Sequence, residues 1–295
     1  MINHPFRSLL FVPGHNEKYI NSALQSDADI LLLDIEDSVQ PRKNKQIARD
    51  LILSFEEQGR FENKTIFPRV NDRESGELLK DLYQLTIPSV NGFMFPKSLN
   101  GDDIYFYDKI LETIEYDKGY PIGTFKIIAL IETPSALLNL NDICQRSGRL
   151  ISIAFGCEDF ITDLEGVHDK SGKSIFTARS LIAIAARANN IIPIDTVHID
   201  INNLEDLKVN IELAKNLGFE GMMLLHPKEI EIANKYYTPS YDEYLKAKKI
   251  IDASKQAIKK GKGVSMDGNQ LVGPPIIKNA KKVIKKYEML KRCKT

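Results

Sequence analysis

Short apolar runs alternate with segments of helical periodicity along most of this chain, and that alternation constrains the fold more than any other feature. Most of the runs are continuous rather than alternating, as expected for parallel strands that are buried on both faces. The eight runs occupy residues 9–13, 30–34, 65–70, 92–96, 126–131, 150–155, 196–201 and 221–225. Eight strand-then-helix units within about 230 residues predict a closed (β/α)8 barrel.

A doubly wound open sheet is the alternative arrangement of such units. That fold normally carries a glycine-rich phosphate loop after its first strand, whereas the first run here ends in Val12-Pro13-Gly14-His15. We therefore favour the barrel, over residues 1–235, and expect a C-terminal helical extension over residues 236–295. Within this extension, residues 241–259 and 275–291 have helical spacing, and the glycine-rich segment 261–268 between them is a candidate lid.

Composition argues against several classes of function. The 295 residues carry 40 basic and 40 acidic side chains, so no overall field attracts a polyanion and we expect no nucleic-acid partner. The three cysteines form no CxxC pair and the N-terminus has no long apolar stretch, so we expect a reduced, cytoplasmic protein without a membrane partner. Histidine is scarce at five residues, with no HxxxH motif or Cys/His cluster, which argues against zinc.

Charged residues follow the apolar runs where the carboxyl ends of barrel strands would lie, and those ends carry the catalytic groups of such barrels. The second run ends in Asp34, with Glu36 and Asp37 close behind. Burying these acids unpaired would be costly, so we interpret them as functional, with a helix N-cap cluster as the alternative. Arg69 lies near the end of the third run, and its fork of donors suits a carboxylate or enolate oxygen. The alternative for Arg69 is a structural ion pair with the preceding acids.

Two further acids follow adjacent runs. Glu132 comes directly after the fifth run, and Asp159 follows the sixth. Two carboxylates, completed by water and substrate oxygens, are the usual way in which proteins hold Mg²⁺. The alternative is a glycosidase-type acid/base pair without metal, which the absence of tryptophan disfavours, because barrel glycosidases usually carry aromatic sugar platforms. Lys97 and His226 also follow runs, but a rim charge and a structural histidine account for them equally well.

Six motifs in register resemble the citrate lyase β-subunit-like family, which includes citryl-thioester, malyl-CoA and citramalyl-CoA lyases. They are Arg7-Ser8 with Phe11-Val12-Pro13-Gly14, Asp34-Ile35-Glu36-Asp37-Ser38-Val39, Arg69-Val70-Asn71, Ile131-Glu132-Thr133, Gly156-Cys157-Glu158-Asp159 and His226-Pro227. The resemblance covers nearly the whole chain. It implies a Mg²⁺-dependent (β/α)8 barrel that assembles as a homotrimer or hexamer.

The resemblance also implies roles for individual residues. By match to the family motifs, Glu132 and Asp159 are the metal ligands. Arg69 holds the substrate oxygens and takes part in catalysis, while Glu36 and Asp37 hold metal-bound water. The other substrate contacts fall on Pro13, Gly14, Glu132, Lys45 and Arg49, of which the last two match a basic pair that touches the thioester carrier.

The C-terminal segment departs from the family pattern. Several members carry a motif reading Asp-Gly-Lys-Met-Ile-Asp-x-Pro, from which an aspartate reaches into a neighbouring subunit as acid or base. Here the segment reads Asp267-Gly268-Asn269-Gln270-Leu271-Val272-Gly273-Pro274, so Val272 occupies the second aspartate position and Asp267 is kept. Asp267 is therefore the remaining catalytic candidate in the lid.

These features predict a carbon–carbon lyase that cleaves a 3-hydroxyacyl thioester to an acetyl thioester and a 2-oxo acid. The thioester carrier is coenzyme A or an acyl-carrier protein. Two alternatives stay open, an aldolase that acts on free 2-oxo acids and a non-catalytic homologue. A phosphoenolpyruvate-type transferase would need a phosphohistidine or a phosphate-binding loop, and we find neither in the sequence.

Overall fold

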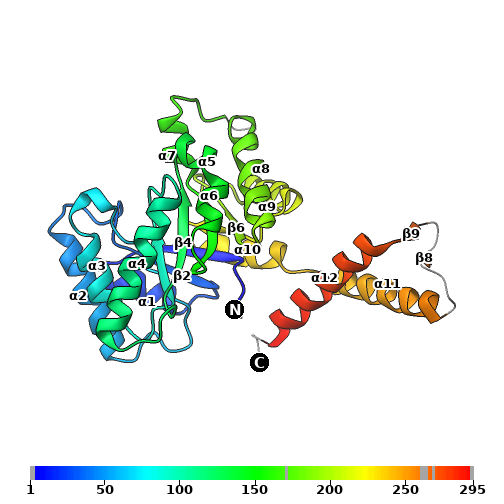
Figure 1. Ribbon diagram of the computed structural model, residues 1–295, viewed down its shortest axis with the longest axis horizontal. Helices are drawn as coiled ribbons and strands as arrows, with labels where there is room; N and C mark the ends of the chain where they lie inside the picture. The colour runs from blue at the N-terminus through cyan, green and yellow to red at the C-terminus, as the bar shows by residue number, and fades with distance from the viewer. Residues whose placement is uncertain (1–3, 170–171, 260–264, 268–269, 293–295) are drawn as a thin grey trace. The chain divides into compact units, whose positions relative to one another are not determined.

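The computed structural model describes residues 4–169, 172–259, 265–267 and 270–292. The chain divides into two compact units, Phe6–Asn234 and the pair of segments Met1–Pro5 and Lys235–Thr295. The first unit contains a parallel sheet and the helices around it, and the second contains a pair of helices (Figure 1). Each unit is described separately below.

Seven parallel strands form a single sheet in the order β2-β1-β7-β6-β5-β4-β3. Their bounds are Ser8–Pro13 (β1), Ile30–Asp34 (β2), Gly92–Phe95 (β3), Lys126–Ile131 (β4), Leu150–Phe155 (β5), Ile192–Asp195 (β6) and Gly221–Leu224 (β7). All residues of β2, β3 and β7 are buried, which agrees with the continuous apolar runs of the sequence.

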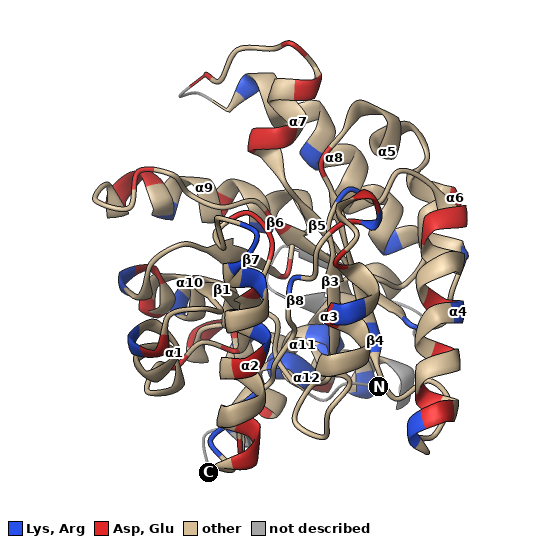
Figure 2. Cartoon of the chain, turned by 90° about the vertical axis from the view of Figure 1, so that its left-hand side faces the viewer, with Lys and Arg blue, Asp and Glu red and all other residues tan. Residues whose placement is uncertain are grey.

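Residues 65–70 occupy the position between β2 and β3 and thereby complete a ring of eight. Isolated parallel bridges join Ile66 and Arg69 to β2 on one side and to Val90 and Met94 on the other. Pro68 has no amide hydrogen to donate, so this segment cannot form an unbroken ladder with both neighbours. The result is a (β/α)8-type barrel, in which the helices surround the ring of strands (Figure 2).

The helices of the barrel unit follow the strands in alternation. Their bounds are Glu17–Leu24 (α1), Asn44–Glu57 (α2), Leu78–Leu85 (α3), Gly101–Lys118 (α4), Pro134–Leu138 (α5), Leu140–Gln145 (α6), Cys157–Asp163 (α7), Lys173–Ala188 (α8), Leu204–Leu217 (α9) and Ile230–Tyr237 (α10), with 3-10 turns at Arg73–Ser75 and Pro227–Glu229. Helix α4 illustrates how the local sequence sets both ends of a helix. The Asn100 side chain accepts hydrogen bonds from the first free amides, and Gly119 ends the helix at a φ of 75°.

The predicted strand at 196–201 is wrong, because the strand in that unit is β6, Ile192–Asp195, and residues 196–201 form the loop that follows it. Pro193 lowers the strand propensity of this stretch and hides it in the sequence. The strand nevertheless pairs with β5 through Ile192, Pro193 and Ile194, and Ser152 Oγ donates a further hydrogen bond to the Ile192 carbonyl at 2.8 Å.

The second unit contains two long helices, α11 (Tyr241–Lys259) and α12 (Pro274–Arg292), which pack against each other. Tyr244 on α11 and Tyr287 on α12 stack with ring centroids 4.4 Å apart. Between the helices, β8 (Ser265–Asp267) and β9 (Gln270–Val272) form an antiparallel pair. Of the predicted lid, residues 261–264 and 268 lie outside the described residues.

Candidate active site at the carboxyl ends of the strands

Arg69 lies at the centre of a charged cluster formed by the carboxyl ends of neighbouring strands. Its Nε and Nη2 atoms donate to the two carboxylate oxygens of Asp34, the last residue of β2, at 2.8 and 2.7 Å. Its Nη1 lies 3.0 Å from Glu36 Oε2 and 3.7 Å from Asp37 Oδ2. Arg69 therefore forms an ion pair with Asp34. Its third nitrogen, Nη1, faces Glu36 and Asp37.

Glu36 is a buried acid without a hydrogen-bonded partner among the described residues. Only 4% of the residue is exposed, and neither carboxylate oxygen accepts a hydrogen bond in that part of the chain, although Lys97 Nζ lies 3.4 Å from Oε1. Burial raises the pKa of Glu36 to about 8 against the pull of Arg69, and the neighbouring charges of Asp37 and Glu132 add to the rise. A buried carboxylate of this kind needs positive charge close by, and Arg69 and Lys97 compensate its charge only in part.

Glu132 follows β4 and reaches into the same cluster. Only 3% of the residue is exposed, and its Oε2 accepts a hydrogen bond from the backbone amide of Lys97 at 2.8 Å. Burial raises the pKa of Glu132 to about 7, against the hydrogen bond from Lys97 and the charge of Arg69. A Cβ added at Gly156 would come 2.5 Å from Glu132 Cγ, so a glycine after β5 leaves the room in which Glu132 lies.

Asp159 lies in the exposed first turn of α7, immediately after β5, and not at the strand end itself. Its negative charge contributes to the raised pKa of Glu132, so the two carboxylates repel each other. Together with Asp34, Glu36, Asp37 and Asp72, these two acids make six carboxylates around two cations, Arg69 and Lys97. The surplus of negative charge and the oxygens of Glu36 without donors fit a hard divalent cation such as Mg²⁺.

Pro13 and Gly14 border this cluster. Pro13 ends β1 and pairs with Asp34, and the Gly14 amide donates to the Asp34 carbonyl at 2.8 Å. A Cβ at position 14 would come 2.9 Å from that carbonyl oxygen, so glycine permits the close approach. Both residues therefore lie beside Asp34, one of the acids of the cluster.

Lys45 and Arg49 lie on α2 and are buried by local contacts. Lys45 Nζ donates to Asn71 Oδ1 and lies 3.4 Å from the backbone carbonyl oxygen of Glu36, so it supports the loop that carries the acids. Arg49 pairs with Glu77 at 2.9 Å and Asp81 at 2.5 Å. These contacts give both residues structural partners, and their contact with a thioester carrier stays a prediction.

A family model for HpcH/HpaI aldolase/citrate lyase matches residues 7–227, which span the strands and every acid of the cluster. The chain belongs to this family. Citrate lyase subunit beta of Haemophilus influenzae is 33% identical over 95% of this chain and 96% of its own length. A (3S)-malyl-CoA thioesterase of Cereibacter sphaeroides is 26% identical over 97% of this chain and 96% of its own. The protein CitE of Mycobacterium tuberculosis, solved with magnesium, acetoacetate and coenzyme A, has a TM-score of 0.76 at 22% identity, covering 97% of this chain and 100% of that one.

Within this family member, Lys97 belongs to the cluster more fully than its sequence position indicated. Besides Glu36 and Glu132 it contacts Asp72, whose Oδ2 lies 3.1 Å from Lys97 Nζ, and its φ of 51° turns the chain after β3. The sequence carried no signal for Asp72 beyond its place just after Arg69-Val70-Asn71. His226 accepts a hydrogen bond from the Lys228 amide at 3.1 Å and caps a turn, which is a structural role.

The backbone of Asp267 belongs to β8, and its side chain lies outside what the structure describes. In the described part of the chain, none of the helices combines the length and the apolar character that a membrane crossing requires.

Proposed function

We propose that this protein is a Mg²⁺-dependent carbon–carbon lyase that cleaves a 3-hydroxyacyl thioester to an acetyl thioester and a 2-oxo acid. The observation that carries the proposal is the cluster of six carboxylates around Arg69 and Lys97, with the buried Glu36 accepting no hydrogen bond in the described chain. Membership of the aldolase/citrate lyase family supports a lyase or aldolase-type reaction on this barrel.

Glu132 and Asp159 would hold the metal, and Glu36 and Asp37 would hold water around it. Bound there, Mg²⁺ would make the substrate hydroxyl more acidic and would offset negative charge on the 2-oxo acid. The fit rests on the donor set, which consists of carboxylates, the ligands that Mg²⁺ prefers. The CitE structure was solved with magnesium, which supports the choice of this ion.

Arg69 has the strongest geometric support for a role in the reaction. Asp34 holds two of its nitrogens, so Nη1 is fixed in place before substrate arrives. During cleavage, the hydroxyl proton leaves to a base, the hydroxyl carbon becomes the keto carbon, and the electron pair of the broken bond forms the thioester enolate. Protonation of that enolate gives the acetyl thioester. A preorganised donor such as Nη1 stabilises the negative charge that develops between these states.

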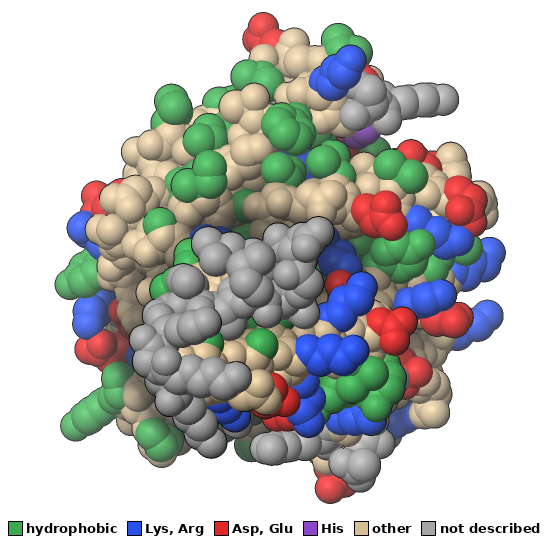
Figure 3. Space-filling view, turned by 90° about the vertical axis from the view of Figure 1, so that its right-hand side faces the viewer, with side chains coloured by type: hydrophobic (Ala, Val, Ile, Leu, Met, Phe, Trp, Pro, Cys, Tyr) green, Lys and Arg blue, Asp and Glu red, His purple; other side chains and the backbone are tan. Residues whose placement is uncertain are grey.

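The C-terminal unit suits an anionic partner. Residues 235–295 contain 16 Lys and Arg against five Asp and Glu, a net charge of +11, so the remaining residues carry −11. Lys and Arg side chains gather on the face drawn in Figure 3. Coenzyme A and acyl-carrier proteins are both anionic, and coenzyme A is present in the CitE structure. We extend the proposal to a phosphate-bearing thioester carrier that interacts with this basic unit.

Assembly belongs to the same proposal. A basic extension and an acidic barrel on one chain favour pairing between copies, in a homotrimer or hexamer whose extension packs on a neighbouring subunit. Light scattering at micromolar concentration should give a trimeric or hexameric mass. A monomeric mass would exclude a lid donated between subunits.

A product assay tests the reaction. Citryl-, malyl- and citramalyl-CoA are incubated separately with the protein, with and without Mg²⁺, and the products are separated by chromatography. The proposal expects equal amounts of acetyl-CoA and 2-oxo acid, formed only with the metal. Free coenzyme A with a hydroxy acid would indicate a thioesterase, the activity named for the Cereibacter relative. Turnover of free acids alone would indicate an aldolase, and no turnover at all a non-catalytic homologue.

A further inference from the structure

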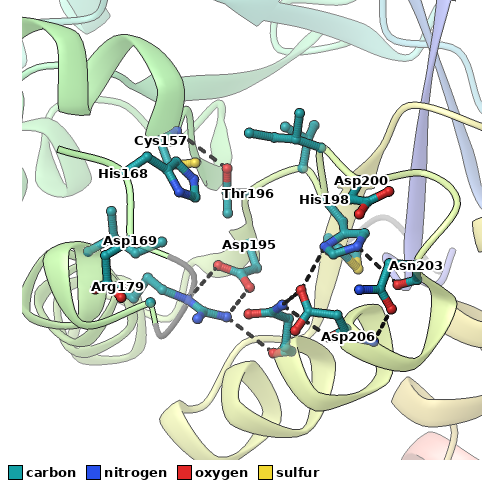
Figure 4. A pocket seen from close by; sticks show the side chains of 16 residues that line it. Cys157, His168, Asp169, Arg179, Asp195, Thr196, His198, Asp200, Asn203 and Asp206 are labelled. Carbon is teal, nitrogen blue, oxygen red and sulfur yellow. Dashed lines mark hydrogen bonds and ion pairs between the residues drawn. The ribbon is translucent and has the colours of Figure 1, made fainter.

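Cys157, Glu158 and His168 bring three different metal-binding groups together beside the carboxyl end of β5. The first two open α7, and His168 lies in the loop between α7 and α8. Glu158 Oε1 lies 3.2 Å from Cys157 Sγ and 3.4 Å from His168 Nε2, and the three ligand atoms all lie within 4.8 Å of one another. Figure 4 shows the sulfur of Cys157 beside the imidazole ring of His168.

We propose that these three side chains form a second metal site, which takes a thiophilic divalent cation of the zinc class. Zinc binds sulfur at about 2.3 Å and nitrogen or carboxylate oxygen at about 2.0–2.2 Å, so a tetrahedral ion separates two nitrogen or oxygen ligands by about 3.3–3.6 Å and sulfur from either by about 3.5–3.7 Å. The distance of 3.4 Å from Glu158 Oε1 to His168 Nε2 matches this geometry, and the distance of 3.2 Å to Cys157 Sγ is a few tenths of an ångström shorter. Thiolate and imidazole together select zinc-like ions over Mg²⁺, which prefers oxygen.

Two of the three ligand residues line a cavity. Cys157 and His168 both line a cavity of about 240 Å³, whose wall continues through Thr196 and the buried pair Arg179 and Asp195. The Cys157 amide donates to Thr196 Oγ1 at 3.3 Å, which fixes the backbone of the ligand segment against the loop after β6. Three protein ligands with one open position are the arrangement of exchangeable zinc sites, so water or a small anion entering the cavity would complete the shell.

The second site is separate from the carboxylate cluster even though α7 contributes to both. Glu158 and Asp159 are consecutive residues of α7, but they interact with different groups. Glu158 contacts Cys157 and His168, whereas Asp159 acts on Glu132. A zinc-class ion could therefore bind without displacing a ligand of the proposed magnesium site.

A surface ion pair is the alternative account of the same contacts. The side chains of His168 and Glu158 are 45% and 50% exposed, and exposed pairs of this kind contribute little to stability. An ion pair of that strength explains neither the thiol beside it nor the opening onto a cavity. The two accounts differ in one measurable property, since only the metal site forms a sulfur–metal bond.

Cobalt(II) is the probe, because a cobalt–thiolate bond gives a charge-transfer absorption in the near ultraviolet. The full chain is titrated with Co²⁺ in excess Mg²⁺, which keeps the carboxylate cluster occupied by the harder ion. We expect the band to saturate at one ion per chain and to disappear when Zn²⁺ is added. Cys157→Ser should abolish the band, and His168→Gln should weaken Co²⁺ binding by at least about tenfold.

Two controls separate this proposal from the lyase proposal. Cys144→Ser removes the other thiol that the structure describes, and Glu132→Gln removes a proposed magnesium ligand, so both should keep the band. A folded wild-type protein without the band, or a band that survives in Cys157→Ser, overturns the second metal site. If Cys157→Ser does not fold, the exposed His168→Gln variant decides, and unchanged Co²⁺ affinity there overturns the proposal as well.

Discussion

Two buried arginine networks lie at opposite ends of the barrel strands and are built differently. Arg149 directly precedes β5, and its Nη1 and Nη2 each donate to one oxygen of the fully buried Glu115 at 2.6 Å. The backbone amides of Gly123 and Phe125 donate to the same carboxylate at 2.8 and 2.9 Å. Arg69, at the carboxyl ends of the strands, leaves Glu36 without a hydrogen bond from any described residue.

The difference between the two networks indicates that one stabilises the fold and the other serves the function. At the amino ends of the strands every oxygen of the buried Glu115 has a donor, so this network is complete without a ligand. At the carboxyl ends the protein retains a surplus of buried negative charge, which costs stability unless a cation arrives. In barrels of this type the carboxyl ends carry the active site and the amino ends support the fold.

The largest expected effect is on stability, at the amino ends. Arg149→Met should leave Glu115 buried without its cation and lower the free energy of unfolding by about 3–5 kcal/mol. Urea denaturation followed by circular dichroism measures the loss. The folded fraction should bind Mg²⁺ as the wild type does. A loss below about 1 kcal/mol would mean that the backbone amides alone satisfy Glu115, and the contrast between the two networks would lose its basis.

The matching substitution at the carboxyl ends should affect turnover. Arg69→Lys keeps the charge but cannot hold Asp34 with two donors and also present a third toward Glu36. We expect turnover of the thioester to fall by about 100-fold or more. Arg149→Lys is the control, because it changes the same residue type in the other network and should keep the turnover per folded molecule. Normal turnover in Arg69→Lys would reduce Arg69 to a structural ion-pair partner.

Metal affinity is the third test. Glu132→Gln and Asp159→Asn should each weaken Mg²⁺ binding by at least about tenfold, because each removes a charged oxygen ligand. Isothermal calorimetry measures the affinity. Neither variant should unfold the protein, since Glu132 is a buried acid with few donors and Asp159 is exposed. Asp108→Asn, in the Arg149 network, should leave Mg²⁺ affinity unchanged, and an unchanged affinity in Glu132→Gln would remove that residue as a ligand.

Acid stability should show a smaller effect in a third arginine network, at α2 and α3. Arg42, Lys80 and Arg49 overcome burial and lower the pKa of Glu77 to about 2, below its ordinary value of 4.5. The stability from this charge is fully present above pH 4.5 and is lost as the pH falls through about 2. Because water screens the exposed Arg42 and Lys80, we expect Glu77→Gln to remove about 1 kcal/mol of the stability difference between pH 5 and pH 3. Urea midpoints at the two pH values measure it, and an unchanged difference would contradict the assignment.

Much of the barrel could be predicted because its strands are buried on both faces and therefore read as continuous apolar runs. The run at 65–70 was found at the right position, although Pro68 leaves it as isolated bridges. The prediction of a strand at 196–201 was wrong, because Pro193 masked the true strand, while the loop after it carries Val197, Ile199 and Ile201 at alternating positions, as a half-buried strand would. An alternating pattern does not by itself distinguish a strand from a loop, and Ile199 in this loop is 50% exposed.

The charged cluster could be predicted in outline for a similar reason, since acids that directly follow apolar runs must gather at one end of a barrel. Two features could not be derived that way. The sequence left the partner of Arg69 open, and the fork is in fact taken by Asp34. The sequence also argued against a Cys/His cluster, whereas the loop after α7 brings His168 to Cys157 and Glu158. Loop geometry decides such contacts, and residue spacing does not encode it.

The smallest effect is expected at the lid. Asp267 pairs with Gln270 across β8 and β9 and is followed in the sequence by Gly268, and Asp followed by Gly is a common turn sequence. Val272, at the position where relatives of this type were expected to carry an acid, is 1% exposed, so an aspartate there would bury a charge and destabilise the hairpin. Asp267→Asn keeps turn propensity and removes the acid, and we expect turnover of the thioester to stay close to that of the wild type. If turnover collapses while calorimetry shows normal Mg²⁺ binding, Asp267 is the acid/base residue, and the carboxyl ends of the strands do not hold all of the catalytic groups.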